Sequence, residues 1–405
     1  MLDNIKAVLV FILVFVFCSN GYLALEEINP AIHEVYWYLL LFGLSALMLL
    51  LTPIEAISNV PKSVFIWIIV FVLSTTLSYA LSTRGPIVVR ELTLLIKAIS
   101  VFFSMFVLLT NPKALKSAFA ALVVVIIVGS TVNTIEFFSD QMVWSSIPGR
   151  AAGWYVNANK SGKYLVMSLI FASVITPKKL LWPLIAITAV GVLLTFSRSS
   201  WIELFVVIVG ISLINNTPVG QKISLLDIKP SQFIALILGG AVAGVLLISL
   251  FSGQAYEMVK DTPFEEYLSK DTIGRMSGDF KDDSANEREE VLLAALKYGL
   301  EAPLLGKGLS FTYEWDQPVA PHNDYAKLFA ERGLVGPVIY LGLMGILWFT
   351  GGRRAKLFVM VWAFSSIATH NTLEQPAIYV FMALALLYKD NDIEIGQLAD
   401  YPGYR

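Results

Sequence analysis

The sequence predicts an all-α polytopic membrane protein with about 12 transmembrane helices and one long loop outside the membrane. Apolar residues make up 56% of the chain and charged residues 15%, whereas a soluble protein carries roughly a quarter charged residues. The mean hydropathy is +0.70, and apolar runs of about 17 residues or more recur along the whole length. These runs lack the alternation of a transmembrane barrel, so helices must cross the bilayer.

The spans follow one another with a single long gap between the ninth and the tenth. They are predicted at 5–24, 36–52, 63–82, 91–110, 116–136, 161–177, 181–197, 200–215, 232–252, 333–350, 355–369 and 375–388. The chain thus divides into 1–252 with spans one to nine, a periplasmic loop domain at 253–323, and 324–405 with spans ten to twelve and a cytoplasmic tail. The first apolar run has Lys6 as its positive flank and no clean small-residue cleavage site, so we expect a retained span and not a cleaved signal.

Basic residues predict the orientation. With an even number of spans, both termini and one set of short loops share a side, and the cations of that side are Lys6, Lys62, Lys113, Lys116, Lys178, Lys179, Lys222, Lys229, Arg353, Arg354, Lys356 and Lys389. The positive-inside rule makes this side the cytoplasm and puts segment 253–323 in the periplasm. Cations in the opposite short loops run against the rule, namely Arg84, Arg90, Arg150, Lys160, Lys163 and Arg198. We expect a functional reason for them.

Several classes of function are disfavoured by composition. A net charge of −2 gives no general attraction to nucleic acid. The single cysteine, Cys18, rules out an internal disulfide framework and a cysteine metal cluster. The three histidines are scattered without acidic partners at ligand spacing, so neither a metal site nor a cofactor is predicted.

Segment 253–323 mixes acidic and basic residues and contains one amphipathic pattern. Leu292, Leu293, Ala295 and Leu296 follow Glu289 and Glu290 with helical spacing. This predicts a helix at 285–299, which glycines and prolines then end. A loop of this length with its own helix usually carries function.

Candidate chemistry rests on cations and one histidine that face the predicted periplasm. A guanidinium stays charged and binds phosphate oxygens through paired N–H groups, which suits Arg150, Arg198 and Arg288 to a lipid pyrophosphate. His322 can accept a proton near neutral pH, and Asp324 could orient its ring or cap the following helix. Further candidates for substrate binding are Arg84, Arg90, Asn159 and Lys160.

Plainer roles stay open for these residues. Arg84, Arg90 and Lys163 fit lipid-headgroup anchors better than a site. Arg198, close to Trp201, could also be an interfacial anchor, and Arg288 could be one charge on a solvated helix. His370 fits a structural role better than a catalytic one.

At this point the motifs resemble a known family. Pro321-His322-Asn323-Asp324-Tyr325, followed by Glu331-Arg332-Gly333-Leu334-Val335-Gly336, resembles the signature of the O-antigen ligase and polymerase superfamily. Three more features are similar to it: Arg150 with Asn157 and Asn159, Ser197-Arg198-Ser199 at the end of a span, and Arg288 ahead of Pro303-Leu304-Leu305-Gly306-Lys307-Gly308. The resemblance covers residues 145–350, together with the long loop before the histidine.

The resemblance implies a GT-C-like membrane glycosyltransferase of the bacterial inner membrane, with an undecaprenyl-pyrophosphate-linked glycan as donor. In the ligase branch the acceptor is a sugar hydroxyl of lipid A-core, and the transfer is inverting and metal-independent. By the same resemblance, His322 would deprotonate or position the acceptor hydroxyl, and Arg198 and Arg288 would neutralise the leaving pyrophosphate.

Other activities stay open. The same signature occurs in O-antigen polymerases, which join lipid-linked repeat units, and in ligases that glycosylate pilin; chain size and the single long loop favour the lipopolysaccharide ligase. A lipid or solute transporter is the alternative from another class, and it would need ionisable residues at mid-membrane. Lys97 and Glu203 are the charges that fall clearly inside predicted spans, and both lie toward the outer end. This distribution favours chemistry at one membrane face.

Overall fold

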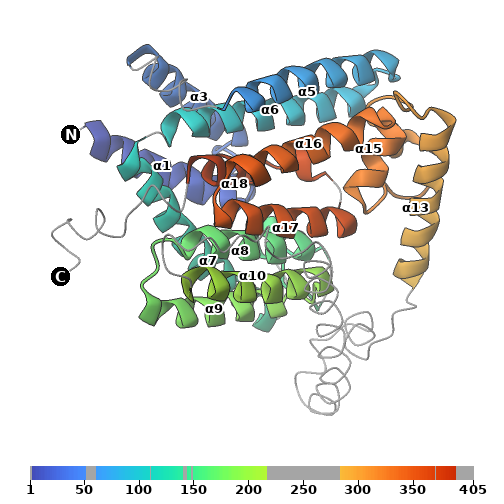
Figure 1. The fold of residues 1–405 in the computed structure, drawn as a ribbon. Coiled ribbons are helices and arrows are strands. Elements are labelled where there is room, and N and C mark those ends of the chain that lie inside the picture. Colours follow the sequence, from blue (N-terminus) through green and yellow to red (C-terminus); the bar gives the residue numbers. More distant parts are fainter. Residues whose placement is uncertain are drawn as a thin grey trace, which may run out of the picture.

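The computed structural model is all-helical over the residues it describes, which are 2–51, 61–109, 111–139, 144–146, 149–216, 283–369 and 371–388. Its longer helices lie beside one another in a bundle, and α13 runs along one end of that bundle (Figure 1). The helices are α1 Leu2–Cys18, α2 Gly21–Ile28, α3 Glu34–Leu51, α5 Lys62–Leu81, α6 Pro86–Leu108, α7 Pro112–Phe138, α8 Ala158–Ala172, α9 Lys178–Leu193, α10 Arg198–Asn216, α13 Asp283–Glu301, α14 Phe311–Glu314, α15 Asp324–Arg332, α16 Val335–Thr350, α17 Arg353–Ala368 and α18 Pro376–Leu387, with short 3-10 turns η1 Gly153–Tyr155 and η3 Thr372–Glu374.

Every predicted span except 5–24 and 232–252 coincides with a described helix to within about five residues. Span 232–252 and the first part of the predicted loop domain lie outside the described residues. Within the part of the chain that the structure describes, four helices are long and apolar enough to cross a membrane, namely α5, α6, α7 and α10, or five if α1 and α2 form one bent span. Shorter apolar helices include α3, α16 and α18. The chain is therefore a multi-pass helical membrane protein, while the number of 12 spans stays a prediction.

The first span is broken, in contrast to the continuous span predicted at 5–24. α1 and α2 meet at an angle of 79°, and Asn20 at the break has a φ of 58°, which asparagine tolerates better than most residues. Distant residues hold this bend: the Asn20 amide donates to the Trp154 carbonyl at 2.7 Å, and the Tyr155 hydroxyl donates to the Cys18 carbonyl at 2.6 Å. The break depends on partners far along the chain, which hydropathy cannot reveal.

The amphipathic helix predicted at 285–299 is confirmed as α13. Val291 and Ala295, one helical turn apart, are buried, and Ala295 packs against Ala326 and Ala330 of α15. Figure 1 shows α13 and α15 on the side of the molecule opposite the N-terminus. We call this side the α15 end.

The helices contain more buried charged side chains than the sequence predicted, which placed only Lys97 and Glu203 clearly inside spans. Glu91 of α6, Glu136 of α7 and Lys163 of α8 are each at most 5% exposed. They join Glu203 as buried charges of the bundle. The prediction from hydropathy was wrong here because it placed Glu91 and Glu136 at span ends, where charges are ordinarily solvated.

Candidate functional site

His322 lies directly before α15 and is half-buried. The helix begins at this point because the side chain of Asn323 accepts a hydrogen bond from the Ala326 amide at 3.0 Å, which satisfies a free N–H of the first turn. The cap is therefore Asn323, and the expectation that Asp324 would provide it was wrong. This cap fixes the backbone on which His322 sits.

Arg288 of α13 lies near His322. Burial lowers the pKa of His322 below its ordinary value, and the positive charge of Arg288 lowers it further. Arg288 itself is exposed, and α13 packs on α15. The structure thus brings together two of the three predicted catalytic residues, and the lowered pKa favours the neutral imidazole, which is the form that can accept a proton.

Arg198, the third predicted catalytic residue, is half-buried at the first position of α10. Contacts connect its surroundings to α15. A Cβ at Gly162 of α8 would collide with Ser200 of α10, so these two helices touch beside Arg198. The next residue of α8 is Lys163, and its ammonium lies 3.5 Å from the Thr369 hydroxyl at the end of α17. These contacts place Arg198 on the side of α8 and α10 that faces the end of α17, and its convergence with His322 and Arg288 stays a prediction.

Arg150 is 1% exposed and contacts protein groups. Its guanidinium donates to the Thr195 carbonyl at 2.9 Å and to the Asn159 side chain at 2.8 Å. Thr195 belongs to the turn that precedes Arg198, so Arg150 joins that turn to the start of α8. Two predicted substrate-binding residues, Arg150 and Asn159, are thus bonded to each other and organise the turn that presents Arg198.

The backbone around Arg150 is itself held by a buried carboxylate. Glu136 is 1% exposed, and its oxygens accept backbone N–H groups from Trp144, Ser145, Ala152 and Gly153 at 2.5–3.1 Å. Hydrogen bonds to an ionised acceptor are among the stronger kind. Glu136 was not singled out from the sequence, where it occupies the end of an apolar run.

Lys160 and the pair Arg84 and Arg90 differ in their surroundings. Lys160 is half-buried and close enough to Glu374 to interact with its charge. Arg84, in the turn before α6, and Arg90, in the first turns of α6, are both exposed, and Arg84 donates to the Ala80 carbonyl at 3.4 Å. Their exposure agrees with headgroup anchors as well as with peripheral substrate contacts.

Asp324 points into the protein and is 4% exposed. One oxygen accepts the Thr372 backbone N–H at 3.2 Å and the other accepts the Tyr340 hydroxyl at 3.2 Å. Burial raises the pKa of Asp324, while the hydrogen bond from Thr372 and the charges of Lys163 and Lys327 oppose that rise. Asp324 thus connects the start of α15 to the segment around η3. His370, near this segment, lies outside the described residues.

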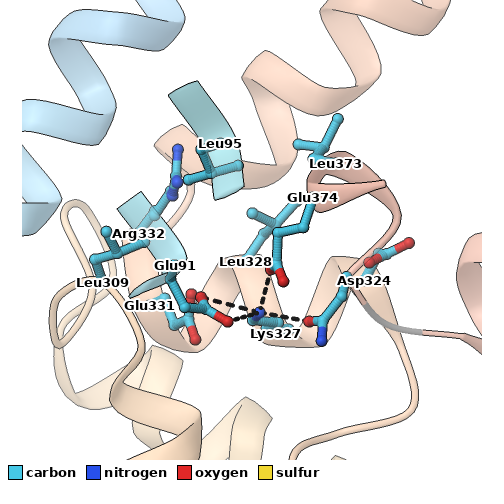
Figure 2. A pocket seen from close by; sticks show the side chains of 11 residues that line it. Glu91, Leu95, Leu309, Asp324, Lys327, Leu328, Glu331, Arg332, Leu373 and Glu374 are labelled. Carbon is cyan, nitrogen blue, oxygen red and sulfur yellow. Dashed lines mark hydrogen bonds and ion pairs between the residues drawn. The ribbon is translucent and has the colours of Figure 1, made fainter. Parts of the chain in front are cut away.

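The most heavily bonded charge at this end is Lys327 of α15, in the middle of the motif that follows His322. Its ammonium lies 2.9 Å from Glu374, 3.4 Å from both oxygens of Glu91, 2.6 Å from Asn371 and 3.5 Å from the Tyr313 hydroxyl. Figure 2 shows Glu91 and Glu374 pointing toward Lys327 from two other segments, while Arg332 points away from it. Burial disfavours the charge, but the surrounding carboxylates outweigh it and hold the pKa of Lys327 above its ordinary value.

A second group of contacts fixes the other end of α15. Arg332 donates to Thr75 of α5 at 3.0 Å, and Glu331 accepts from Thr312 at 2.7 Å. The 303–309 segment runs alongside, and the Lys307 and Gly308 amides donate to carbonyls of α15 at 2.9 and 3.0 Å. Both ends of α15 are thus bonded to other parts of the chain.

Carboxylates outnumber cations among the buried groups around α15. Glu91, Asp324, Glu331 and Glu374 face Lys327 and Arg332, and all six are at most 9% exposed. They line a cavity of about 20 Å³, which is room for one water molecule. Among the described residues no cluster of histidine, cysteine, aspartate and glutamate has the geometry to hold a metal ion.

Sequence reasoning missed Lys327, Glu91 and Glu374 as a group. The available signal was spacing: Lys327 and Glu331 stand four residues apart on one face of a predicted helix. Glu91 was overlooked beside Arg90, its exposed neighbour. Glu374 lies in a short connection before the last span, and an acidic residue at such a position is expected to be exposed to water.

Part of the chain matches a known protein family. Residues 183–341 match the family model described as O-antigen ligase. A search of curated proteins found no match. The matched region contains Arg198, Arg288, His322 and Lys327, whereas Arg150, Glu91 and Glu374 lie outside it. The resemblance predicted from the motifs is confirmed over these residues, and the chain is consistent with a member of the O-antigen ligase-type superfamily.

Proposed function

We propose that this protein is a metal-independent membrane glycosyltransferase that moves a polyprenyl-pyrophosphate-linked O-antigen glycan onto a sugar hydroxyl of lipid A-core. One observation carries the proposal: a half-buried His322 lies beside Arg288 at the α15 end, inside the region that matches the O-antigen ligase family. The match indicates ligase- or polymerase-type activity on lipid-linked glycans, and the ligase reaction is our more specific choice.

In the proposed reaction, His322 acts as the general base. Its neutral nitrogen takes the proton of the acceptor hydroxyl as that oxygen attacks the anomeric carbon of the donor. The bond between this carbon and the pyrophosphate oxygen breaks, and the lipid pyrophosphate leaves from the opposite face. Attack from one face and departure from the other inverts the configuration at the anomeric carbon.

Arg198 and Arg288 stabilise the charge that develops on the leaving pyrophosphate. Fixed cations are most effective in a site shielded from water, because they need no reorganisation as the charge appears. Arg150 acts through the turn before Arg198 and through Asn159. The loss of one such donor typically reduces the rate roughly a hundredfold, or about 3 kcal/mol.

The proposed site faces the periplasm of a bacterial inner membrane, since the α15 end lies opposite the lysine-rich loops that the positive-inside rule assigns to the cytoplasm. The same geometry would serve a polymerase, for which the acceptor is a second lipid-linked repeat unit. Buried charges gathered around α15 favour either transferase over a transporter, which would carry such groups along a path through the membrane.

A reconstituted transfer assay tests the proposal. We expect His322→Ala, Arg198→Ala and Arg288→Ala each to reduce transfer at least a hundredfold, while Lys297→Ala, which removes an exposed cation from the same helix α13, leaves it unchanged. Activity should persist in excess EDTA. Wild-type rates in any of the three site variants would remove that residue from the scheme.

A deletion strain separates the ligase from its relatives. A ligase deletion lacks the long lipopolysaccharide ladder and accumulates lipid-linked polymer. A core that carries one repeat unit would identify a polymerase. If the His322→Ala variant still moves lipid-linked glycan across vesicle membranes without transferring it, the protein is a transporter.

A further inference from the structure

An apolar groove lies between α7 and α9, away from the α15 end. It has a volume of about 390 Å³ and is lined by Val123 and Ile127 of α7 and by Leu180, Pro183, Leu184 and Ile187 of α9, among others. The one hydroxyl among its lining residues, that of Thr176, donates to the Ala172 carbonyl of its own segment at 2.8 Å. The groove therefore offers an occupant apolar surface and no free side-chain donor.

The groove has the depth of one membrane leaflet. Its wall on the α9 side runs from Pro177 to Ile187, which is about 15 Å at the rise of an α-helix. This is roughly half of the ~30 Å hydrocarbon core of a bilayer. α7, the other wall, is one of the helices long and apolar enough to cross the membrane. Leu180 is 51% exposed and Ile127 is 43% exposed, so acyl chains can reach the groove.

Lysines stand at one mouth of the groove. α7 and α9 run parallel: Asn133 donates to the Gly191 carbonyl at 3.0 Å near the C-terminal ends of both helices, and Ala120 and Pro177, near their N-terminal ends, line the same groove. Lys178 directly follows Pro177, so it stands at the end of the groove that Ala120 also lines. Lys178 and Lys179 are exposed there. Lys116 stands one turn before Ala120 on the same face of α7.

Pro183 lines the groove from within α9 and adds a polar feature near the mouth. A proline within a helix has no N–H to donate to the residue four positions earlier, and its ring displaces that turn. The carbonyl of Lys179 therefore cannot receive the usual helical hydrogen bond from position 183. It can accept a hydrogen bond from a hydroxyl-bearing headgroup instead.

We infer that this groove is a binding site for an anionic glycerophospholipid, with one acyl chain between α7 and α9 and its phosphate at Lys178 and Lys179. The two features agree in position: the apolar groove lies at the depth of the acyl chains, and the cations lie at the depth of the headgroup. Their side is the predicted cytoplasmic one, where anionic lipids attract basic residues near the surface. The site is independent of glycan transfer.

Native mass spectrometry of the full-length protein tests this inference. The purified protein is incubated with phosphatidylglycerol or with phosphatidylcholine of the same acyl chains, and retained lipid is counted. We expect one preferentially retained phosphatidylglycerol. Lys178→Gln and Lys179→Gln should each weaken its binding roughly fivefold while leaving phosphatidylcholine unchanged.

Variants that fill the groove with a larger side chain provide a second test of the inference. Val123→Trp or Ile127→Trp should displace the bound lipid of either kind, whereas Ile69→Trp, at a 60% exposed position of α5, should not. Unchanged glycan transfer in the tryptophan variants shows that they are folded. Equal retention of the two lipids by the wild-type protein, or retention unaffected by both groove-filling variants, would overturn the inference.

Discussion

Replacing Lys327 with methionine should destabilise the α15 end strongly. The ammonium lies 2.9 Å from Glu374 and 3.4 Å from Glu91, and at an effective dielectric of about 20 these attractions are worth roughly 6 and 5 kcal/mol before desolvation. Its own desolvation offsets several kcal/mol of this. Removal of one partner from a buried pair costs about 3–5 kcal/mol, because the remaining charge is left buried without compensation. We expect a loss of that size in the free energy of unfolding.

A denaturant titration in nanodiscs, followed by tryptophan fluorescence, measures this loss. Lys307→Met is the matched control, because Lys307 pairs with Glu301 at 2.7 Å but the two side chains are 30% and 42% exposed. An exposed pair contributes about 0–1 kcal/mol. Adding Glu374→Gln to Lys327→Met removes one of the uncompensated carboxylates and should recover part of the loss. An unfolding midpoint for Lys327→Met that equals that of Lys307→Met would refute the reasoning.

Two further predictions concern proton transfer and backbone conformation. If His322 is the base, kcat/KM should fall in acid as the imidazole protonates, with a midpoint below the ordinary 6.5; Arg288→Gln should move that midpoint upward, because a positive charge no longer opposes protonation, and an unmoved midpoint would show that the titrating group is not His322. Gly333→Ala should destabilise by roughly 1–3 kcal/mol or more, because Gly333 has a φ of 58° and a new Cβ would collide with the Leu304 carbonyl. Gly342→Ala is its control, since a Cβ there meets nothing within 4 Å, and thermal unfolding that ranks the two variants alike would contradict this explanation.

The fold was largely predictable because the bilayer constrains it. A long apolar run has one low-energy solution in lipid, which is a helix. Helical spacing likewise predicted the helix α13, but not its buried face: Val291 and Ala295 are buried, whereas Leu293 and Leu296 of the predicted apolar set are 58% and 40% exposed. Helix packing and bends depend on contacts between distant residues, and the break at Asn20 is an example.

The motifs of the candidate site could be recognised from the sequence, but the side-chain contacts inside the site could not. His322 and Arg288 were proposed from residue type and order, and the region that matches the O-antigen ligase model contains both, while their catalytic roles stay predictions. The roles of Arg150 and Asp324 changed once their partners were known, because both bond to protein groups within the bundle.

By itself, the sequence determined that the chain is helical and membrane-embedded and that its histidine motif is of the O-antigen ligase type. Only the tertiary structure decided which charges are buried together: Lys327 meets Glu91 across 236 positions of the chain and Glu374 across 47. The physical reason is that helical periodicity fixes which face a residue occupies. The partner on the opposing face follows from packing among helices that are remote in the sequence.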